Sequence, residues 1–193
     1  MIPAGLVGTI HWLEDVFEGL KLGRSYGGAI AYNYYGPPRL TQDVDVLALI
    51  PAIQSPALIE ALAGGGCLLG DVDPKPLDVK AALAELRGRG HMVTLVRQGI
   101  RIEIFAPWHP FHSRVLERSP ERVLDGRTIR IHSAEDLIVF KKIFDRPKDI
   151  MDIKAMLLAQ KGRLNTARLL SDAKGLLADA NWKELEDLIT RYA

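Results

Sequence analysis

Two aspartates stand where folding alone would not favour them. Asp43 and Asp45 lie two residues apart at the start of the apolar run Val44–Ile50. In a strand, residues at this spacing project from the same face. Strands disfavour aspartate, and two carboxylates on one face repel each other. We therefore expect a positive group to offset the pair.

Glu103 is a third acidic residue in an apolar setting. The run Ile100–Phe105 alternates, so Arg101, Glu103 and Phe105 share one face of an expected strand. If this strand pairs with the strand that carries the two aspartates, three carboxylates converge. An all-oxygen cluster without histidine or cysteine suits a hard cation such as Mg²⁺ or Mn²⁺. The alternative is that all three residues are solvated at strand ends and hairpin faces.

A pair of glycines precedes the carboxylates in the chain. Gly27 and Gly28 lead into a short expected helix over residues 29–35, which ends in the loop Gly36-Pro37-Pro38. Glycine permits close approach of a ligand to the backbone, and amides at a helix start attract phosphate oxygens. A plain turn is the alternative. The order of the segments, with Asp-x-Asp next along the chain, favours a phosphate-binding turn.

These segments together resemble a known family. The stretch GGAIAYNYYGPPRLTQDVDV, which starts at Gly27, resembles the nucleotidyltransferase superfamily, in which a Gly-Gly or Gly-Ser turn precedes Asp-x-Asp. Its Arg-x-Thr-x-Asp-x-Asp form, with Arg39 and Thr41, is similar to the branch that contains the AbiEii-type abortive-infection toxins. Ile102-Glu103-Ile104 matches the later strand that brings the third carboxylate. Residues 135–153 are similar to the branch's closing Lys…Arg…Asp…Asp pattern.

The resemblance implies a fold, an activity and a set of site residues. The fold is that of DNA polymerase beta, an α/β (α+β) mixed sheet with flanking helices and a helical C-terminal part. The activity is transfer of a nucleoside monophosphate from an NTP such as ATP to a hydroxyl. Asp43, Asp45 and Glu103 would hold two metal ions, and Glu103 would also accept the proton of the attacking hydroxyl. The nucleotide-binding residues that it implies are Gly27, Gly28, Arg39, Thr41, Lys141 and Asp149.

Elementary chemistry agrees with this assignment. Nucleotidyl transfer needs in-line positioning and neutralisation of phosphate charge more than covalent help. Two metal ions about 3.5–4 Å apart can bind both the attacking and the leaving oxygen. Lys141 and Asp149 also have a simpler interpretation, because basic groups at helix ends and acidic groups in first turns stabilise the helix dipole.

The acceptor is open at this stage. The resemblance implies tRNA or a protein as acceptor, and a role as the toxin of a toxin–antitoxin pair with an antitoxin protein as partner. Transfer to a small molecule, such as an aminoglycoside, is an alternative. A second alternative is a nucleotide-binding or regulatory module with little activity. It is motivated by Gly28, where many family members have serine, and by Glu103, where aspartate is usual.

The helices and strands that must position these residues are predicted from hydrophobic periodicity and from turn and capping residues. Gln98-Gly99 between two apolar runs predicts a hairpin. Residues 1–131 are expected to form the mixed α/β nucleotidyltransferase core, and residues 132–193 a helical C-terminal subdomain. Expected strands cover residues 44–50, 92–97, 100–105 and 128–131. Expected helices are 9–22 with Thr9 as cap, 29–35, a helix from Ser55, 77–87, 133–144 with Ser133 as cap, one from Pro147, 166–179 and 181–192. Residues 106–126 are expected to be irregular or short-helical.

Bulk composition excludes several classes of protein. The chain has 193 residues, 48% of them hydrophobic, and a net charge of +1, which excludes intrinsic disorder. No uncharged apolar run approaches the roughly 20 residues of a membrane span. A lone cysteine, Cys67, suits a reducing compartment, and the first residues lack a signal-peptide pattern. We therefore expect a cytoplasmic protein without membrane contact and without global attraction to nucleic acid.

Overall fold

The two apolar runs of the sequence form neighbouring strands at the centre of a sheet. In the computed structural model, which describes residues 2–193, β2 (Asp43–Leu49) pairs in parallel with β6 (Ile100–Phe105). β6 pairs antiparallel with β5 (Met92–Arg97) through a turn at Gln98 and Gly99, which have φ of 51° and 77°. Left-handed backbone at both positions is what a tight two-residue hairpin needs. The predicted hairpin is confirmed.

Shorter strands complete the sheet. β1 (Gly23–Tyr26) pairs antiparallel with β2, and β3 (Leu68–Leu69) and β4 (Lys75–Pro76) extend the sheet beyond β5. The strand order is β1-β2-β6-β5-β3-β4. A separate hairpin joins β7 (Glu121–Leu124) to β8 (Arg127–Arg130). The result is the mixed sheet that we expected, although the strands β1, β3, β4 and β7 were not predicted.

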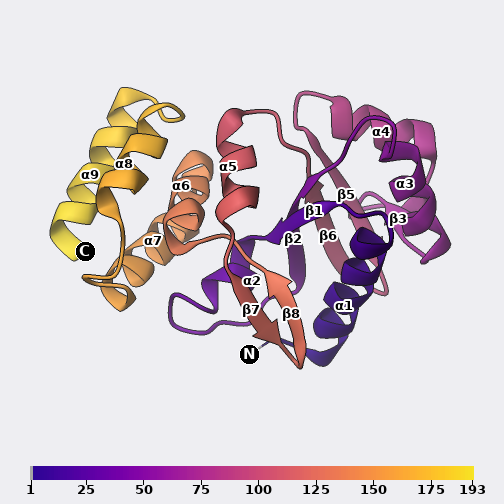
Figure 1. Cartoon of the computed structure of the whole chain (residues 1–193), viewed down its shortest axis with the longest axis horizontal. Helices are drawn as coiled ribbons and strands as arrows, with labels where there is room; N and C mark the ends of the chain where they lie inside the picture. Colours follow the sequence, from indigo (N-terminus) through magenta and orange to yellow (C-terminus); the bar gives the residue numbers. More distant parts are fainter. Residues whose placement is uncertain (1) are drawn as a thin grey trace.

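Helices flank the sheet and form the C-terminal part of the chain (Figure 1). In this view α1, α3 and α4 lie on one side of the central strands, and α5 and α6 lie on the other, with α8 and α9 at the end of the molecule. None of the helices within residues 2–193 is long and apolar enough to cross a membrane. Their bounds are α1 (Ala4–Gly19), α2 (Gly28–Tyr32), α3 (Ser55–Gly64), α4 (Val79–Arg87), α5 (Pro110–Arg118), α6 (Ala134–Phe144), α7 (Pro147–Ala159), α8 (Thr166–Lys174) and α9 (Asp179–Tyr192).

The expected start of the first helix was wrong. α1 begins at Ala4, and Thr9 lies buried within it, where its hydroxyl donates to the Gly5 carbonyl at 3.1 Å. Apolar periodicity continues upstream of Thr9, and threonine in a helix can bond to the carbonyl four residues earlier. Ser133, by contrast, does cap α6, because its side chain accepts from the Asp136 N–H. Residues 106–126 contain the short helix α5, which agrees with the expected short-helical structure, and the strand β7, which was not expected.

The two faces of the central strands have different surroundings. Val44, Val46, Ile102 and Ile104 have no exposed surface and form the core on one face. The alternate residues face the other side, as a two-residue period requires. On that side α2 contacts both β2 and α6, and α5 contacts β2. The acidic residues of β2 and β6 therefore point toward the C-terminal helices rather than into the core.

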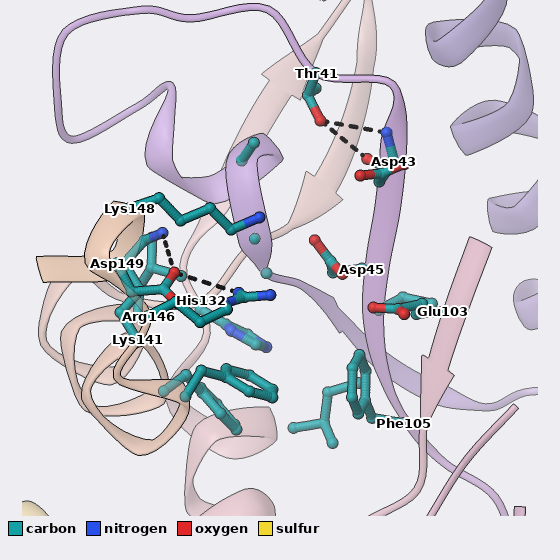
Figure 2. Close-up of a pocket in the computed structure, with 18 of the residues that line it drawn as sticks. Thr41, Asp43, Asp45, Glu103, Phe105, His132, Lys141, Arg146, Lys148 and Asp149 are labelled. Carbon is teal, nitrogen blue, oxygen red and sulfur yellow. Dashed lines mark hydrogen bonds and ion pairs between the residues drawn. The ribbon is translucent and has the colours of Figure 1, made fainter. Parts of the chain in front are cut away.

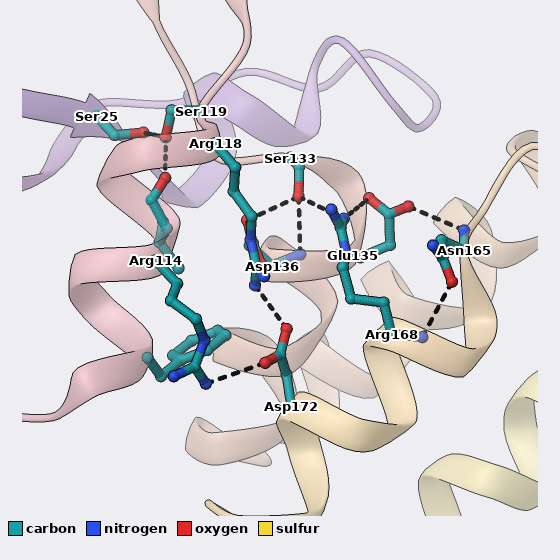
Figure 3. A network of polar contacts seen from close by, with 12 residues as sticks. Ser25, Arg114, Arg118, Ser119, Ser133, Glu135, Asp136, Asn165, Arg168 and Asp172 are labelled. Atoms are coloured by element: carbon teal, nitrogen blue, oxygen red, sulfur yellow. Dashed lines mark hydrogen bonds and ion pairs between the residues drawn. The ribbon is translucent and has the colours of Figure 1, made fainter.

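Polar side chains fasten the C-terminal helices to the sheet domain (Figure 3). Arg118 at the end of α5 binds the buried Asp136 of α6 and reaches Asp172 of α8 at 2.7 Å. Arg168 of α8 pairs with Glu135 of α6 at 2.7 Å. These ion pairs join three helices, so α6 is held rigidly where its side chains meet the acidic face of the sheet.

Candidate active site

The strand register brings the predicted carboxylates together. In the parallel pair of β2 and β6, Asp45 lies directly opposite Glu103, and Asp43 lies opposite Arg101. All four side chains stand on the face that the alternating pattern indicated. The pairing on which the predicted cluster depended is therefore present, and it adds one basic residue that we had not assigned to the site.

The electrostatics of Asp45 show how this cluster differs from an ordinary surface. Burial, together with the neighbouring Glu103 and Asp43, raises the pKa of the Asp45 carboxyl to about 7, against the charge of Lys141. A carboxylate that is desolvated beside like charges is stabilised by a proton or by a cation. Near neutral pH this site therefore favours the binding of a positive ion.

Arg101 supplies part of that positive charge. Its guanidinium donates to Glu103 and lies 3.2 Å from a carboxylate oxygen of Asp71 in the loop after β3. Glu103 is mostly shielded from solvent, with 15% of its side chain exposed. Arg101 thus holds the Glu103 carboxylate in place on the open face of β6.

The carboxylate oxygens of the three acidic residues are the kind of ligand that suits a hard divalent cation. The three acidic residues are all-oxygen donors on one face, and Asp45 needs a compensating charge. Within the part of the chain that the structure describes, no three carboxylate, imidazole or thiolate groups are gathered closely enough to enclose an ion. Asp43, Asp45 and Glu103 therefore fit a metal in the kind of donor atom, whereas their present arrangement does not enclose an ion and Glu103 is bound by Arg101.

The glycine turn is fastened to β2 beside Asp45. The Gly27 N–H donates to the Asp45 carbonyl at 2.9 Å, so this amide already has a partner. Gly28 has φ of 51°, and a Cβ at this position would lie 1.7 Å from a carboxylate oxygen of Asp45. A side chain at Gly28 would displace Asp45 and strain the backbone. The position of the Asp45 carboxylate in this chain therefore requires glycine at position 28.

A network of ion pairs forms the opposite wall. The Lys141 Nζ lies 2.5 Å from Asp152 and 3.6 Å from Asp149, and Arg39 reaches Asp152 at 3.3 Å. Arg146 donates to Asp149 at 2.5 Å. Burial opposes ionisation of Asp149, but hydrogen bonding from Arg146 and the charge of Lys141 prevail and lower its pKa. The closing motif of the sequence thus forms one charged cluster.

Lys148 differs from the other basic residues of this wall. It is exposed, and within residues 2–193 it makes no ion pair. Figure 2 shows Lys148 and Arg146 facing Asp45 and Glu103 across the cavity. Thr41 lies at the far end, where its hydroxyl is 3.3 Å from the backbone of Asp43. The wall therefore offers cationic groups opposite a carboxylate cluster.

A single cavity of about 270 Å³ contains every residue that the sequence predicted for the site. The nine are Gly27, Gly28, Arg39, Thr41, Asp43, Asp45, Glu103, Lys141 and Asp149. The cavity is also lined by residues not predicted for it, which include Arg101, Phe105, His132, Phe140, Arg146 and Lys148. Arg101 and Phe105 share the face of Glu103, a signal present in the sequence. His132 and Phe140 have no such signal, because tertiary packing alone brings them there.

Comparison with solved structures identifies the architecture. The solution structure of the antibiotic-resistance factor ANT(2'')-Ia superimposes with a TM-score of 0.57 at 16% identity, over 96% of this chain and 97% of that one. A nucleotidyltransferase-like protein from Paracoccidioides brasiliensis gives 0.52 at 18% identity, over 98% and 94% of the two chains. This chain has the nucleotidyltransferase fold.

A third structure has the same nucleotidyltransferase fold. The lincosamide antibiotic adenylyltransferase LnuA, in its lincomycin-bound crystal structure, gives a TM-score of 0.51 at 16% identity, over 76% of this chain and 93% of that one. No family model and no curated protein matches the sequence. The likeness to these three structures therefore establishes the fold, and the activity is argued from the site.

Proposed function

We propose that the protein is a Mg²⁺-dependent nucleotidyltransferase that moves a nucleoside monophosphate from an NTP to a hydroxyl. The observation that carries this proposal is the pairing of Asp45 with Glu103 on adjacent parallel strands, beside Asp43 and opposite a basic wall in one cavity. The nucleotidyltransferase fold of the chain supports the same conclusion. Such a cluster is costly for folding and useful for phosphoryl chemistry.

Each part of the cavity has a role in this reaction. Asp43, Asp45 and Glu103 would hold two divalent ions, Mg²⁺ or Mn²⁺, which when bound neutralise the phosphate charge. Arg146 and Lys148 bind the triphosphate from the opposite wall. The acceptor hydroxyl attacks the α-phosphorus, and its proton passes to a carboxylate oxygen of Glu103. The bond from the α-phosphorus to the bridging oxygen then breaks, and pyrophosphate leaves.

For the acceptor we propose a macromolecule, tRNA or protein, with the chain acting as a toxin of the AbiEii type that an antitoxin protein restrains. The Arg-x-Thr-x-Asp-x-Asp stretch and the Lys…Arg…Asp…Asp cluster support this branch, because both motifs line the same cavity. A second candidate is a small-molecule acceptor. Its motivation is a further solved structure of the same fold, that of ANT(2'')-Ia in complex with adenylyl-2''-tobramycin, at 16% identity and a TM-score of 0.51.

A labelling experiment tests both levels of the proposal. The protein is incubated with Mg²⁺ and each α-labelled NTP, together with total tRNA, a protein extract, an aminoglycoside or a lincosamide. We expect label on one acceptor class, and its loss in EDTA. Asp43→Asn and Asp45→Asn should abolish transfer, whereas Asp187→Asn, an exposed aspartate of α9, should leave it unchanged. Transfer that survives in either of the first two variants would contradict the proposed mechanism.

A further inference from the structure

His132 is a buried polar residue whose ring makes no polar contact. It follows β8 and is 6% exposed, and its backbone N–H donates to the Tyr26 carbonyl at 2.8 Å. Its ring lines the cavity, yet neither ring nitrogen has a hydrogen-bond partner within residues 2–193. Native proteins pair nearly all buried polar groups, so an unpaired imidazole in a cavity wall indicates a partner that enters the cavity.

The ring is held in a defined orientation. It stacks on Phe140 of α6, with centroids 4.9 Å apart and planes 19° apart, and Phe140 stacks in turn on His112. On the opposite side, a Cβ on Gly27 would lie 2.7 Å from the imidazole Cε1, so the ring occupies the space that a side chain there would need. Glycine at position 27 and the stack with Phe140 together fix the imidazole beside the Gly27-Gly28 turn.

The chemistry of this imidazole is that of a neutral group. Burial, together with the nearby His112, lowers the pKa of His132 to about 3. A neutral imidazole presents one N–H donor and one nitrogen acceptor. It therefore suits a polar but uncharged ligand group, whereas the guanidinium of Arg146 and the ammonium of Lys148 suit phosphate.

The lining of the cavity includes charged groups and aromatic rings. Arg146 and Lys148 face the carboxylates, and Figure 2 shows His132 beside Arg146 and Phe105 across the cavity below Glu103; we call the part of the cavity that these two rings line its aromatic end. Leu47, Leu137 and Phe140 also line the cavity. In-line displacement places the acceptor hydroxyl opposite the departing pyrophosphate. If pyrophosphate lies against the basic wall, the acceptor approaches from the Glu103 side, and the aromatic end remains for the nucleoside.

We propose that this aromatic end binds the nucleoside of the NTP, and that His132 hydrogen-bonds the base and sets which base the enzyme prefers. The inference rests on the proposed function, since it needs an NTP in the cavity. Phe105 supplies flat apolar surface for a heteroaromatic ring, and the imidazole edge of His132, held by Phe140, hydrogen-bonds the polar atoms of the base. His132 is thus a specificity-determining residue, distinct from the carboxylates that carry the reaction.

A measurement on the wild-type protein tests the contact directly. Histidine ¹⁵N-labelled protein is titrated, with Mg²⁺ and without acceptor, with ATP, GTP, CTP and UTP in turn and with inorganic tripolyphosphate. We expect the ring nitrogens of His132 to shift with the preferred NTP and to stay in place with tripolyphosphate at the same saturation. Equal shifts with both ligands, or none with any bound NTP, would overturn the inference while leaving nucleotide binding intact. Failure of every NTP to bind would overturn the proposed function and this inference with it.

Variants give an independent test by calorimetry. His132→Phe keeps a stacking ring and removes both nitrogens, so NTP binding should weaken about tenfold and the preference among bases should flatten. Binding of tripolyphosphate should change by less than about twofold, because phosphate contacts are retained. His132→Asn keeps a donor and an acceptor and should recover part of the NTP affinity. The matched control is His11→Phe, which removes an imidazole bonded to the Leu124 carbonyl outside the cavity.

Equal loss of NTP and tripolyphosphate affinity in His132→Phe would show a structural role and contradict base recognition. Unchanged NTP affinity and base preference in a folded His132→Phe protein would do the same. If this variant does not fold, the nitrogen shifts of the wild-type protein decide the question alone.

Discussion

At the scale of single residues, the cavity concentrates groups that folding would avoid. Asp45 lies against Glu103 in a desolvated setting, and its pKa rises to about 7 as a result. His132 is buried with two unpaired nitrogens. Perturbed and unpaired groups of this kind gather at functional sites, where a ligand completes their interactions. The stability of the folded protein should therefore depend on pH and on bound ligands in predictable directions.

Asp45→Asn should stabilise the metal-free protein. The folded-state pKa of Asp45 lies above its unfolded value of 3.8, so the folded protein holds the extra proton and loses stability as pH rises from about 4 to about 7. The asparagine side chain does not ionise, so the variant does not lose stability in this pH range. In EDTA, urea unfolding should show a gain of about 2 kcal/mol at pH 8 that shrinks toward zero near pH 4. The more exposed Asp43→Asn should gain less. A variant less stable than wild type at pH 8 would show that Asp45 is not destabilised by its neighbours.

Glu103→Gln separates catalysis from binding. The glutamine keeps the size of the side chain and loses its charge and basicity, so transfer should slow by roughly two to four orders of magnitude. NTP affinity should fall only modestly, because Asp43 and Asp45 remain. Glu103→Asp introduces the carboxylate that is usual in the nucleotidyltransferases that the sequence resembles, and it should retain activity. Rapid-quench rates and calorimetric affinities measure the two effects, and a Glu103→Gln enzyme as fast as wild type would exclude Glu103 as the base.

At the scale of elements, two kinds of sequence pattern predicted the structure correctly. The hairpin of β5 and β6 was predicted with its observed bounds, because Gln98-Gly99 separates two apolar runs. The shared face of Asp43, Asp45 and Glu103 followed from a period of two. β1 was missed because Gly23–Tyr26 carries no apolar run, and it forms by pairing with β2. His132 was missed for a similar reason, since its place in the cavity depends on how α6 docks.

Docking of the C-terminal helices depends on Arg118, which joins α5 to α6 and α8 (Figure 3). Asp136 is 1% exposed, so Arg118→Met leaves a buried carboxylate without its cation and should cost about 3 kcal/mol. Arg118→Met combined with Asp136→Asn should recover part of this loss. Arg114→Met removes the exposed partner of Asp172 and should cost less than about 1 kcal/mol. Equal effects of the two arginine variants in urea unfolding would refute the distinction.

At the scale of the whole molecule, the cavity joins the two parts of the chain. Its carboxylates, Asp43, Asp45 and Glu103, come from the sheet, and its basic wall comes from α6, α7 and their junction. A net charge of +1 provides no long-range attraction for polyanions, so recognition of a nucleotide must come from this local convergence. A ligand that fills the cavity therefore contacts both parts of the chain and stabilises their contact.

Hydrogen exchange should reveal this bridging. With Mg²⁺ and the preferred NTP at about 100 times its Kd, linkage gives about 2.7 kcal/mol of stabilisation, or a rise in Tm of roughly 5–10 °C. Slower exchange should appear together in α2, β2 and the α6–α7 junction, because the ligand contacts all three, whereas exposed amides of α9 should change little. The matching nucleoside, which lacks phosphates, should protect the basic wall far less. Protection confined to the sheet, with none at the α6–α7 junction, would mean that the basic wall does not take part in binding.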